Sequence, residues 1–242
     1  MLYVTGDVHG QLDRFEEKAF KKLTKEDTLF ILGDFGFLWD GSAAEKKALA
    51  WLEKRPYRIL FLDGCHENYE MLAAYPEEDF CGGRVQHIGG NVYHVCRGSL
   101  LEMEGRTLFC LGGGESDDIE DREEGVNWWR AELPEPGLLE ECRSRLESRG
   151  WQTDYILTHD APGRILEFMG LNARRQEVLN PLQVFLNELN EKGQYTQWLF
   201  GRYHADRRLG SKMQEVFGGL VKLESEPPAK KRWIFHRKEK TK

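Results

Sequence analysis

The stretch LYVTGDVHG, residues 2–10, joins a short run of apolar side chains to a polar turn. The same arrangement recurs in TLFILGDFG, residues 28–36, and in RILFLDGCHEN, residues 58–68. Apolar periodicity predicts amphipathic helices after these runs, over residues 11–23, 43–54 and 67–75. Alternating strands and helices predict a largely parallel sheet with helices on its faces. Open sheets of this kind bind ligands at the carboxyl ends of their strands, which is where the polar turns lie.

The second half of the chain has closely spaced strands as well as helices. Val92–Val95, Ser99–Met103 and Arg106–Leu111 read as antiparallel strands, with a tight turn at Glu104-Gly105. Further on, the pattern predicts helices over residues 137–149 and 181–192, and strands over 154–158, 197–200 and 213–217. Residues 161–176 follow no clear period. Strands throughout the chain with helices flanking both halves predict two packed mixed sheets.

Length and charge describe a single acidic body with a basic end. The 242 residues fit one domain without a linker, which we assign to residues 1–224, followed by a tail over residues 225–242. The net charge is −7, but the tail carries +5, so that residues 1–224 carry −12. An acidic body disfavours nucleic acid as a partner without excluding it, and the tail is expected to be a solvated terminus.

Two further features concern location and redox state. No apolar run approaches the roughly 20 residues that span a bilayer, and the start MLYVTGDVHG lacks the pattern of a signal peptide. We therefore expect a cytoplasmic protein without a membrane partner. The five cysteines are scattered and form no C-x-x-C pair, so we expect reduced, buried thiols, with Cys65 as the exception.

Five polar clusters follow predicted strands and together carry the chemistry. They contain two aspartates and four of the seven histidines, in the motifs Asp7-Val8-His9, Gly33-Asp34, Gly64-Cys65-His66-Glu67, His159 and Gly201-Arg202-Tyr203-His204. Each cluster alone is weak, because a single histidine at a strand end is more often structural. Jointly they offer the imidazoles and carboxylates that divalent transition metals bind. In an extended segment Asp7 and His9 would point to the same side and hold one ion.

In this order the five motifs resemble the pattern D-x-H, G-D, G-N-H-[D/E], H, G-H-x-H of the calcineurin-like metallophosphoesterases. The resemblance spans residues 3–206 and implies a four-layer α/β/β/α sandwich of two mixed sheets flanked by helices, with residues 1–224 as the phosphoesterase domain. The opening GDVHGQ also resembles Ser/Thr protein phosphatases. Their second motif continues differently from Gly33-Asp34-Phe35-Gly36-Phe37, which favours a general bacterial-type phosphoesterase.

The resemblance also implies roles for single residues. Asp7, His9 and His204 would hold a first metal, Asp34 would bridge to a second, and His159 would bind the second. His66 would protonate or hydrogen-bond the leaving oxygen. The implied reaction is hydrolysis of a phosphomonoester or phosphodiester by attack of a metal-bound hydroxide. The implied cofactor is a divalent transition metal (Mn, Fe or Zn), one or two ions per chain.

Two positions depart from the family pattern, and both belong to the second metal. Cys65 replaces the asparagine ligand, and Arg202 replaces the first histidine of the last motif. Arginine has no lone pair to donate to a metal. In one reading, which we prefer, Arg202 fills the place of the second metal, pairs with Asp34 and grips the substrate phosphate. In the other, Asp34, Cys65 and His159 hold a softer metal such as zinc. A thiolate at Cys65 would offset the charge of Arg202.

These residues predict a metal-dependent phosphoric ester hydrolase, a phosphatase or phosphodiesterase. Its expected partner is a small-molecule or nucleotide phosphate ester, and the sequence does not indicate an oligomeric state. The alternative is a degenerate member that binds metal or a phosphorylated ligand without turnover. The acidic loop of residues 113–122 and the pair Trp128-Trp129 are weaker candidates, for which a solvated loop and a covered sheet edge are the plainer interpretations.

Overall fold

Two mixed β-sheets form the centre of the protein. The structure is a computed structural model that describes residues 1–171 and 179–224. The first sheet has the strand order β13-β1-β2-β3-β6-β5-β4, and the second has the order β11-β12-β10-β9-β8-β7. The strands of the first sheet are β1 (Leu2–Thr5), β2 (Thr28–Ile31), β3 (Arg58–Phe61), β4 (Glu77–Phe80), β5 (Gly83–Gly89), β6 (Val92–Val95) and β13 (Val221–Lys222). Those of the second are β7 (Ser99–Met103), β8 (Arg106–Leu111), β9 (Tyr155–Thr158), β10 (Gln197–Phe200), β11 (Arg207–Leu209) and β12 (Met213–Glu215).

Parallel pairing dominates the middle of each sheet. In the first sheet β1, β2, β3 and β6 run parallel, and in the second β8, β9, β10 and β12 do. The edges are antiparallel: β13, β5 and β4 in the first sheet, β11 and β7 in the second. Parallel strands present their carboxyl ends at the same edge, so the loops that follow β1, β2, β3, β9 and β10 can meet there.

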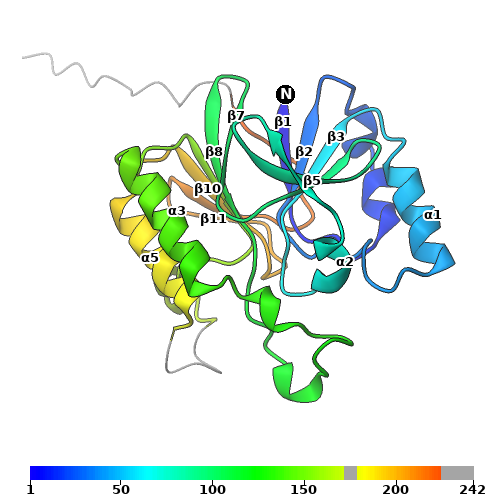
Figure 1. Cartoon of the computed structure of the whole chain (residues 1–242). Helices are drawn as coiled ribbons and strands as arrows, with labels where there is room; N and C mark the ends of the chain where they lie inside the picture. Colours follow the sequence, from blue (N-terminus) through cyan, green and yellow to red (C-terminus); the bar gives the residue numbers. More distant parts are fainter. Residues whose placement is uncertain (172–178, 225–242) are drawn as a thin grey trace, which may run out of the picture.

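Helices cover the outer faces of both sheets, which gives the four-layer α/β/β/α sandwich (Figure 1). On one side lies α1 (Ala43–Leu52), and on the other lie α3 (Pro136–Ser148) and α5 (Pro181–Lys192). Two short helices complete the described set, α2 (Tyr69–Ala73) and α4 (Gly163–Phe168). Within residues 1–171 and 179–224, no helix is long and apolar enough to cross a membrane.

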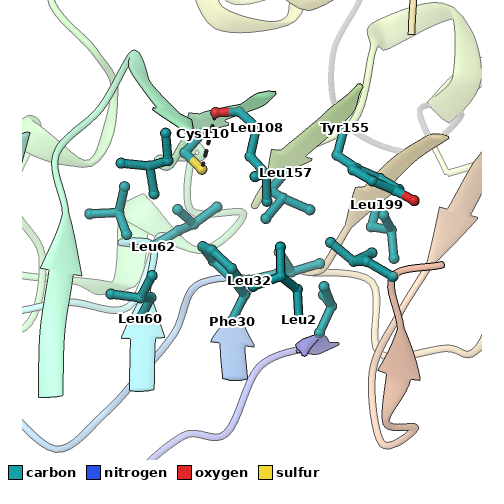
Figure 2. Close-up of a cluster of buried hydrophobic side chains, with 14 of the residues drawn as sticks. Leu2, Phe30, Leu32, Leu60, Leu62, Leu108, Cys110, Tyr155, Leu157 and Leu199 are labelled. Carbon is teal, nitrogen blue, oxygen red and sulfur yellow. Dashed lines mark hydrogen bonds between the residues drawn. The ribbon is translucent and has the colours of Figure 1, made fainter. Parts of the chain in front are cut away.

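Three apolar clusters hold these layers together. The central cluster lies between the two sheets, where Leu32 and Leu62 face Leu108 and Leu157 (Figure 2). A second cluster joins the first sheet to the side of α1, and a third joins the second sheet to α3 and α5. Central strands such as β2 and β9 are therefore buried on both faces, which explains their continuous apolar runs.

The structure corrects two local predictions. Residues 11–23 do not form an α-helix but two 3-10 turns, η1 (Leu12–Glu16) and η2 (Phe20–Lys22), separated by Glu17 in an extended conformation. The helical spacing reflects the burial of Phe15 and Phe20 against the sheet, which outweighs local propensity. In addition, β6 does not pair with β7: β6 lies beside β3 and β5 in the first sheet, and only β7 and β8 form a hairpin.

Other predictions either hold or fall outside the described residues. The hairpin turn at Glu104-Gly105 is confirmed, with φ of 51° and 71°. Strands β4, β5, β11 and β13 were not predicted; β4, for example, is the charged segment EEDF, which has no apolar alternation to mark it. The unclear segment 161–176 contains α4, and its residues 172–176 are not described. The tail assigned to residues 225–242 is also not described, and the domain boundary at 224 remains a proposal.

Candidate metal centre

The five motifs converge at the carboxyl edge of the two sheets. Asp7, Asp34 and His159 are buried, whereas His9 and His204 are partly open to solvent. Their metal-binding atoms form three overlapping clusters, in each of which all atoms lie within 4.8 Å of one another. The clusters are Asp7–His9–His204, Asp7–Asp34–His159 and Asp34–Cys65–His66. The structure thus brings together seven residues that are up to 197 positions apart in the chain.

The first cluster has the geometry of a mixed carboxylate and imidazole site. Nε2 of His9 lies 3.0 Å from Nε2 of His204, and Nε2 of His204 lies 3.2 Å from Oδ2 of Asp7. Nε2 of His9 is also 3.9 Å from Oδ2 of Asp7 and 3.8 Å from Oδ2 of Asp34. The carboxylate of Asp7 raises the pKa of His204 by stabilising its protonated form. One cation at this point could accept both imidazoles and the Asp7 oxygen.

Hydrogen bonds to the backbone orient Asp7, Asp34 and His159. Each of these side chains keeps one further oxygen or nitrogen that can bind a metal. The backbone N–H of Arg202 donates to Oδ1 of Asp7 at 2.9 Å, and that of His66 donates to Oδ1 of Asp34 at 2.8 Å. Nδ1 of His159 donates to the carbonyl of Leu32 at 2.7 Å, which leaves the lone pair on Nε2. Burial alone would raise the pKa of Asp34, but His159 and His66 lower it below its usual value. Asp34 is therefore ionised and able to bind a cation.

Two buried atoms of this site have no hydrogen-bond partner among the described residues: Oδ2 of Asp7 and Nε2 of His159. An unsatisfied buried polar atom costs about 1–3 kcal/mol, so such atoms require another explanation. Both belong to one cluster with Asp34. The hydrogen bond from His159 to a carbonyl is also the contact that usually fixes the tautomer of a metal-bound histidine. The residues present therefore fit a divalent metal.

Backbone strain is concentrated at the same positions. His9, Asp34, Arg202 and His204 have φ of 45°, 48°, 71° and 54°, in the left-handed region that residues other than glycine rarely adopt. Such conformations cost about 1–3 kcal/mol each and cluster at functional sites. The expected extended geometry of the Asp7–His9 segment is therefore wrong: His9 reaches the Asp7 cluster through a left-handed turn, held by its N–H donating to the Asp34 carbonyl at 2.8 Å.

Two motif glycines allow the close approach of site residues. A Cβ atom at Gly64 would lie 2.0 Å from Oδ1 of Asp34, and one at Gly33 would lie 2.2 Å from Nδ1 of His159. Gly33 also has a φ of 101°. Any side chain at these positions would displace a candidate ligand, which gives a physical reason for glycine there.

Arg202 does not pair with Asp34 as expected. Its guanidinium instead forms a buried ion pair with Asp160, with 2.5 Å between Nη1 and Oδ2, and Nη2 donates to the carbonyl of Glu115. Asp117 lies 3.8 Å from Nη2. Asp160 lies directly after His159, and its carboxylate is fully buried. The guanidinium of Arg202 therefore has this buried carboxylate, and not that of Asp34, as its ion-pair partner. Because the ends of the guanidinium are engaged in this way, Arg202 is not free to grip a phosphate with both.

Cys65 lies beside Asp34, and its surroundings favour the neutral thiol over the thiolate. Its Sγ is 3.8 Å from Oδ2 of Asp34. Burial and the Asp34 carboxylate raise the pKa of the thiol well above its usual range, although Arg202 acts in the opposite direction. Without a bound ion Cys65 is therefore neutral, and the charge that balances Arg202 comes from Asp160 rather than from a thiolate. Cys65 clusters with Asp34 and His66, whereas His159 clusters with Asp7 and Asp34.

Asp160 is the site residue that the sequence interpretation missed. Its Oδ1 accepts hydrogen bonds from the N–H of Ala161, at 2.8 Å, and from the hydroxyl of Tyr203. The available signal was its position next to His159 in the stretch THDAP. Two further segments reach the site region: the acidic loop, through Asp117, and Trp129, which packs against Trp39 with 5.6 Å between ring centroids. The acidic loop is therefore more than a solvated surface loop.

The two-sheet sandwich gathers carboxylates and imidazoles at its strand ends, where they form a candidate site for a divalent metal. The chain belongs to the calcineurin-like phosphoesterase family, whose model matches residues 1–201. This family hydrolyses phosphate esters and uses divalent metal ions. No curated protein matches the chain.

Proposed function

We propose that the protein hydrolyses phosphate esters, with a divalent transition metal held by Asp7, His9 and His204. The observation that supports this most strongly is the convergence of carboxylate oxygens and imidazole nitrogens. Asp7 Oδ2 and His159 Nε2 are buried without a hydrogen bond among the described residues, and Asp7 also clusters with His9 and His204. Manganese, iron and zinc all suit this set of nitrogen and oxygen donors. The chemistry that such an ion supplies is the activation of water and the neutralisation of charge on the phosphate.

The remaining residues have separate roles in this proposal. Asp34, held by the His66 N–H, fixes the loops after β2 and β3 relative to each other. Hydrolysis adds water across the phosphorus–oxygen bond, and the departing alcohol oxygen takes a proton. His66 lines the cavity beside His9, and it protonates or hydrogen-bonds that oxygen. Burial lowers the pKa of His66, so the neutral imidazole predominates at neutral pH and donates a hydrogen bond. Full transfer of a proton to the leaving oxygen would require the protonated ring.

We propose one tightly bound ion per chain. At one of the two positions that hold second-ion ligands in the family pattern, this chain has Arg202, which has no lone pair to offer and is a cation paired with Asp160. A guanidinium this close to the site also repels a second dication. Asp34 and His159 therefore contribute to the shell around the first ion and support at most weak binding of another.

Metal content and turnover together test the proposal. The purified protein, loaded with Mn²⁺ and dialysed, should hold about one ion per chain and hydrolyse 4-nitrophenyl phosphate or bis(4-nitrophenyl) phosphate. Asp7→Asn should lose both the ion and the activity. Asp79→Asn is a matched control, because Asp79 is exposed on β4, and it should lose neither. Full metal content and turnover in Asp7→Asn would show that this ligand assignment is wrong.

The alternative of ligand binding without turnover draws on one observation, the replacement of two family ligands by Cys65 and Arg202. A protein that binds its ion and a phosphate ester but hydrolyses neither nitrophenyl ester would support this alternative over the enzyme. Isothermal titration with phenylphosphonate, which has no ester bond to cleave, measures the binding separately.

A further inference from the structure

A cavity of about 770 Å³ opens directly from the candidate metal centre. His9 and His66 are among its lining residues, which places the cavity beside the point at which the ester bond would be broken. The apolar part of its lining is formed by Leu12, Phe37, Trp39, Ala44 and Ala48. Cavities of about 300–1,000 Å³ with apolar walls and few polar groups are typical of small-molecule sites. Its position assigns it to the part of a substrate that is attached to the phosphate.

The wall of this cavity is held in place by the surrounding structure. The carboxylate of Glu45 accepts hydrogen bonds from three consecutive N–H groups: Trp39, Asp40 at 3.2 Å and Gly41 at 2.7 Å. Nδ2 of Asn68 donates to the carbonyl of Trp39 at 2.7 Å, and Trp129 packs against the Trp39 ring. Because all of these contacts are made by the protein's own groups, the wall is preformed, and binding does not require it to be ordered first.

The apolar surface continues past the cavity along α1. A neighbouring hollow of about 510 Å³ shares Leu12, Ala44 and Ala48 with the first cavity and reaches Trp51. Lys47 and Lys54 border this outer hollow. A leaving group longer than one ring therefore has an apolar path away from the metal centre.

Charge restricts what the inner cavity can accept. Among the described residues that line it, the lysine and arginine side chains are represented by Arg122 alone, whose Nε and Nη2 donate to the two oxygens of Asp118 at 2.7 and 2.9 Å. Asp40 and Glu45, two acidic residues, lie in the same lining. A second phosphate or carboxylate would find no free cation there and would be repelled by Asp40. The inner cavity therefore disfavours a second anionic group next to the ester.

We propose that this cavity binds the alcohol part of the substrate, and that the substrates are phosphate esters of uncharged, largely apolar alcohols. The proposal rests on the proposed phosphoesterase function, since it places the ester bond between His66 and the metal ligands. It goes beyond that function by naming the substrate class. Aryl and long-chain alkyl alcohols share the required chemistry.

Binding of phosphonates tests the substrate class without any need for turnover. The Mn²⁺-loaded protein is titrated calorimetrically with methylphosphonate, octylphosphonate and naphthylphosphonate. One methylene in a hydrophobic pocket changes affinity about tenfold or more, so at least one of the larger compounds should bind about tenfold or more tightly than methylphosphonate. A preference for the naphthyl compound indicates an aryl alcohol, and one for the octyl compound indicates an alkyl alcohol.

Two neighbouring alanines provide the matched variants. Ala43 and Ala44 are both exposed in the first turn of α1, where glutamate is well tolerated, but only Ala44 lines the cavity. Ala44→Glu should reduce binding of the preferred larger phosphonate about fivefold or more, by analogy with the loss of apolar contact at a pocket wall. It should leave methylphosphonate binding unchanged. Ala43→Glu should change neither.

Equal affinity for all three phosphonates would overturn the proposal, and so would an equal effect of Ala43→Glu and Ala44→Glu. Failure of the proposed function has a different signature: nitrophenyl esters would not be hydrolysed, whatever the phosphonate preference. If esters are hydrolysed but no phosphonate binds more tightly than methylphosphonate, the proposed phosphoesterase function stands and the proposed site for an apolar leaving group is refuted.

Discussion

The buried ion pair between Arg202 and Asp160 gives the sharpest prediction. Asp160→Asn keeps the shape of the side chain but removes its charge, and leaves a guanidinium that is only 9% exposed without a counterion. Removing one partner of a buried pair costs about 3–5 kcal/mol. With a urea dependence of about 2.5 kcal/mol/M, the midpoint of unfolding should fall by about 1–2 M. Urea unfolding followed by tryptophan fluorescence measures this shift.

A double-mutant cycle separates the ion pair from other effects. Arg202→Met removes the cation, so adding Asp160→Asn to it should cost about 1–3 kcal/mol less than Asp160→Asn costs in the wild type. The exposed pair of Arg84 and Asp79, at 2.9 Å, is the control, and its Asp79→Asn variant should leave the midpoint nearly unchanged. Additive costs in the cycle, or a loss below about 1 kcal/mol in Asp160→Asn, would refute the assignment of Asp160 as the counterion.

The Arg202–Asp160 ion pair should also determine whether mutations at Cys65 and Arg202 allow a second metal ion to bind. Restoring the family ligands with Cys65→Asn and Arg202→His leaves Asp160 buried without its guanidinium partner. We therefore expect the double reversion to be destabilised and to bind a second ion less well than a triple variant that also carries Asp160→Asn. Metal analysis after dialysis tests this order. A second ion bound as well by the double variant as by the triple variant would contradict it.

Three further predictions concern the metal centre. His66→Asn should slow hydrolysis of alkyl phosphates more than that of nitrophenyl phosphates, whose leaving group needs little protonation; equal losses would leave His66 with a binding role only. Gly64→Ala should lower metal content because its Cβ would meet Asp34, whereas Gly137→Ala, where a Cβ meets nothing within 4 Å, should leave metal content unchanged. Removing the metal with a chelator should lower the melting temperature of the wild type but not of Asp7→Asn, and equal shifts in both would place the ion elsewhere.

Much of the architecture could be read from local patterns. The apolar runs at β1, β2 and β3 and the polar turns after them predicted parallel strands with polar site residues at their carboxyl ends, and the structure has both. These predictions succeed because a strand buried on both faces must be apolar along its length, whatever its neighbours are. The five ordered motifs likewise indicated residues that the structure gathers into candidate metal-binding clusters, and the family match agrees with the resemblance.

Local sequence patterns failed to predict the structure where a segment packs against or pairs with residues that are distant in the chain. The spacing of residues 11–23 is helical, yet the burial of Phe15 and Phe20 imposes two 3-10 turns. The strand β6 is close in sequence to β7 but pairs with β3, because the chain crosses from one sheet to the other between them.

The sequence by itself determined the kind of centre: the aspartates, the histidines and the two departures at Cys65 and Arg202 are visible without coordinates. Only the tertiary structure decided how the departures are accommodated. Asp160 is 42 positions from Arg202 and belongs to no motif, yet it supplies the charge that had been expected from Cys65 or Asp34. The physical reason is that a buried charge is stabilised by whichever opposite charge lies nearest in space, and that distance is fixed by the packing of β9 against β10.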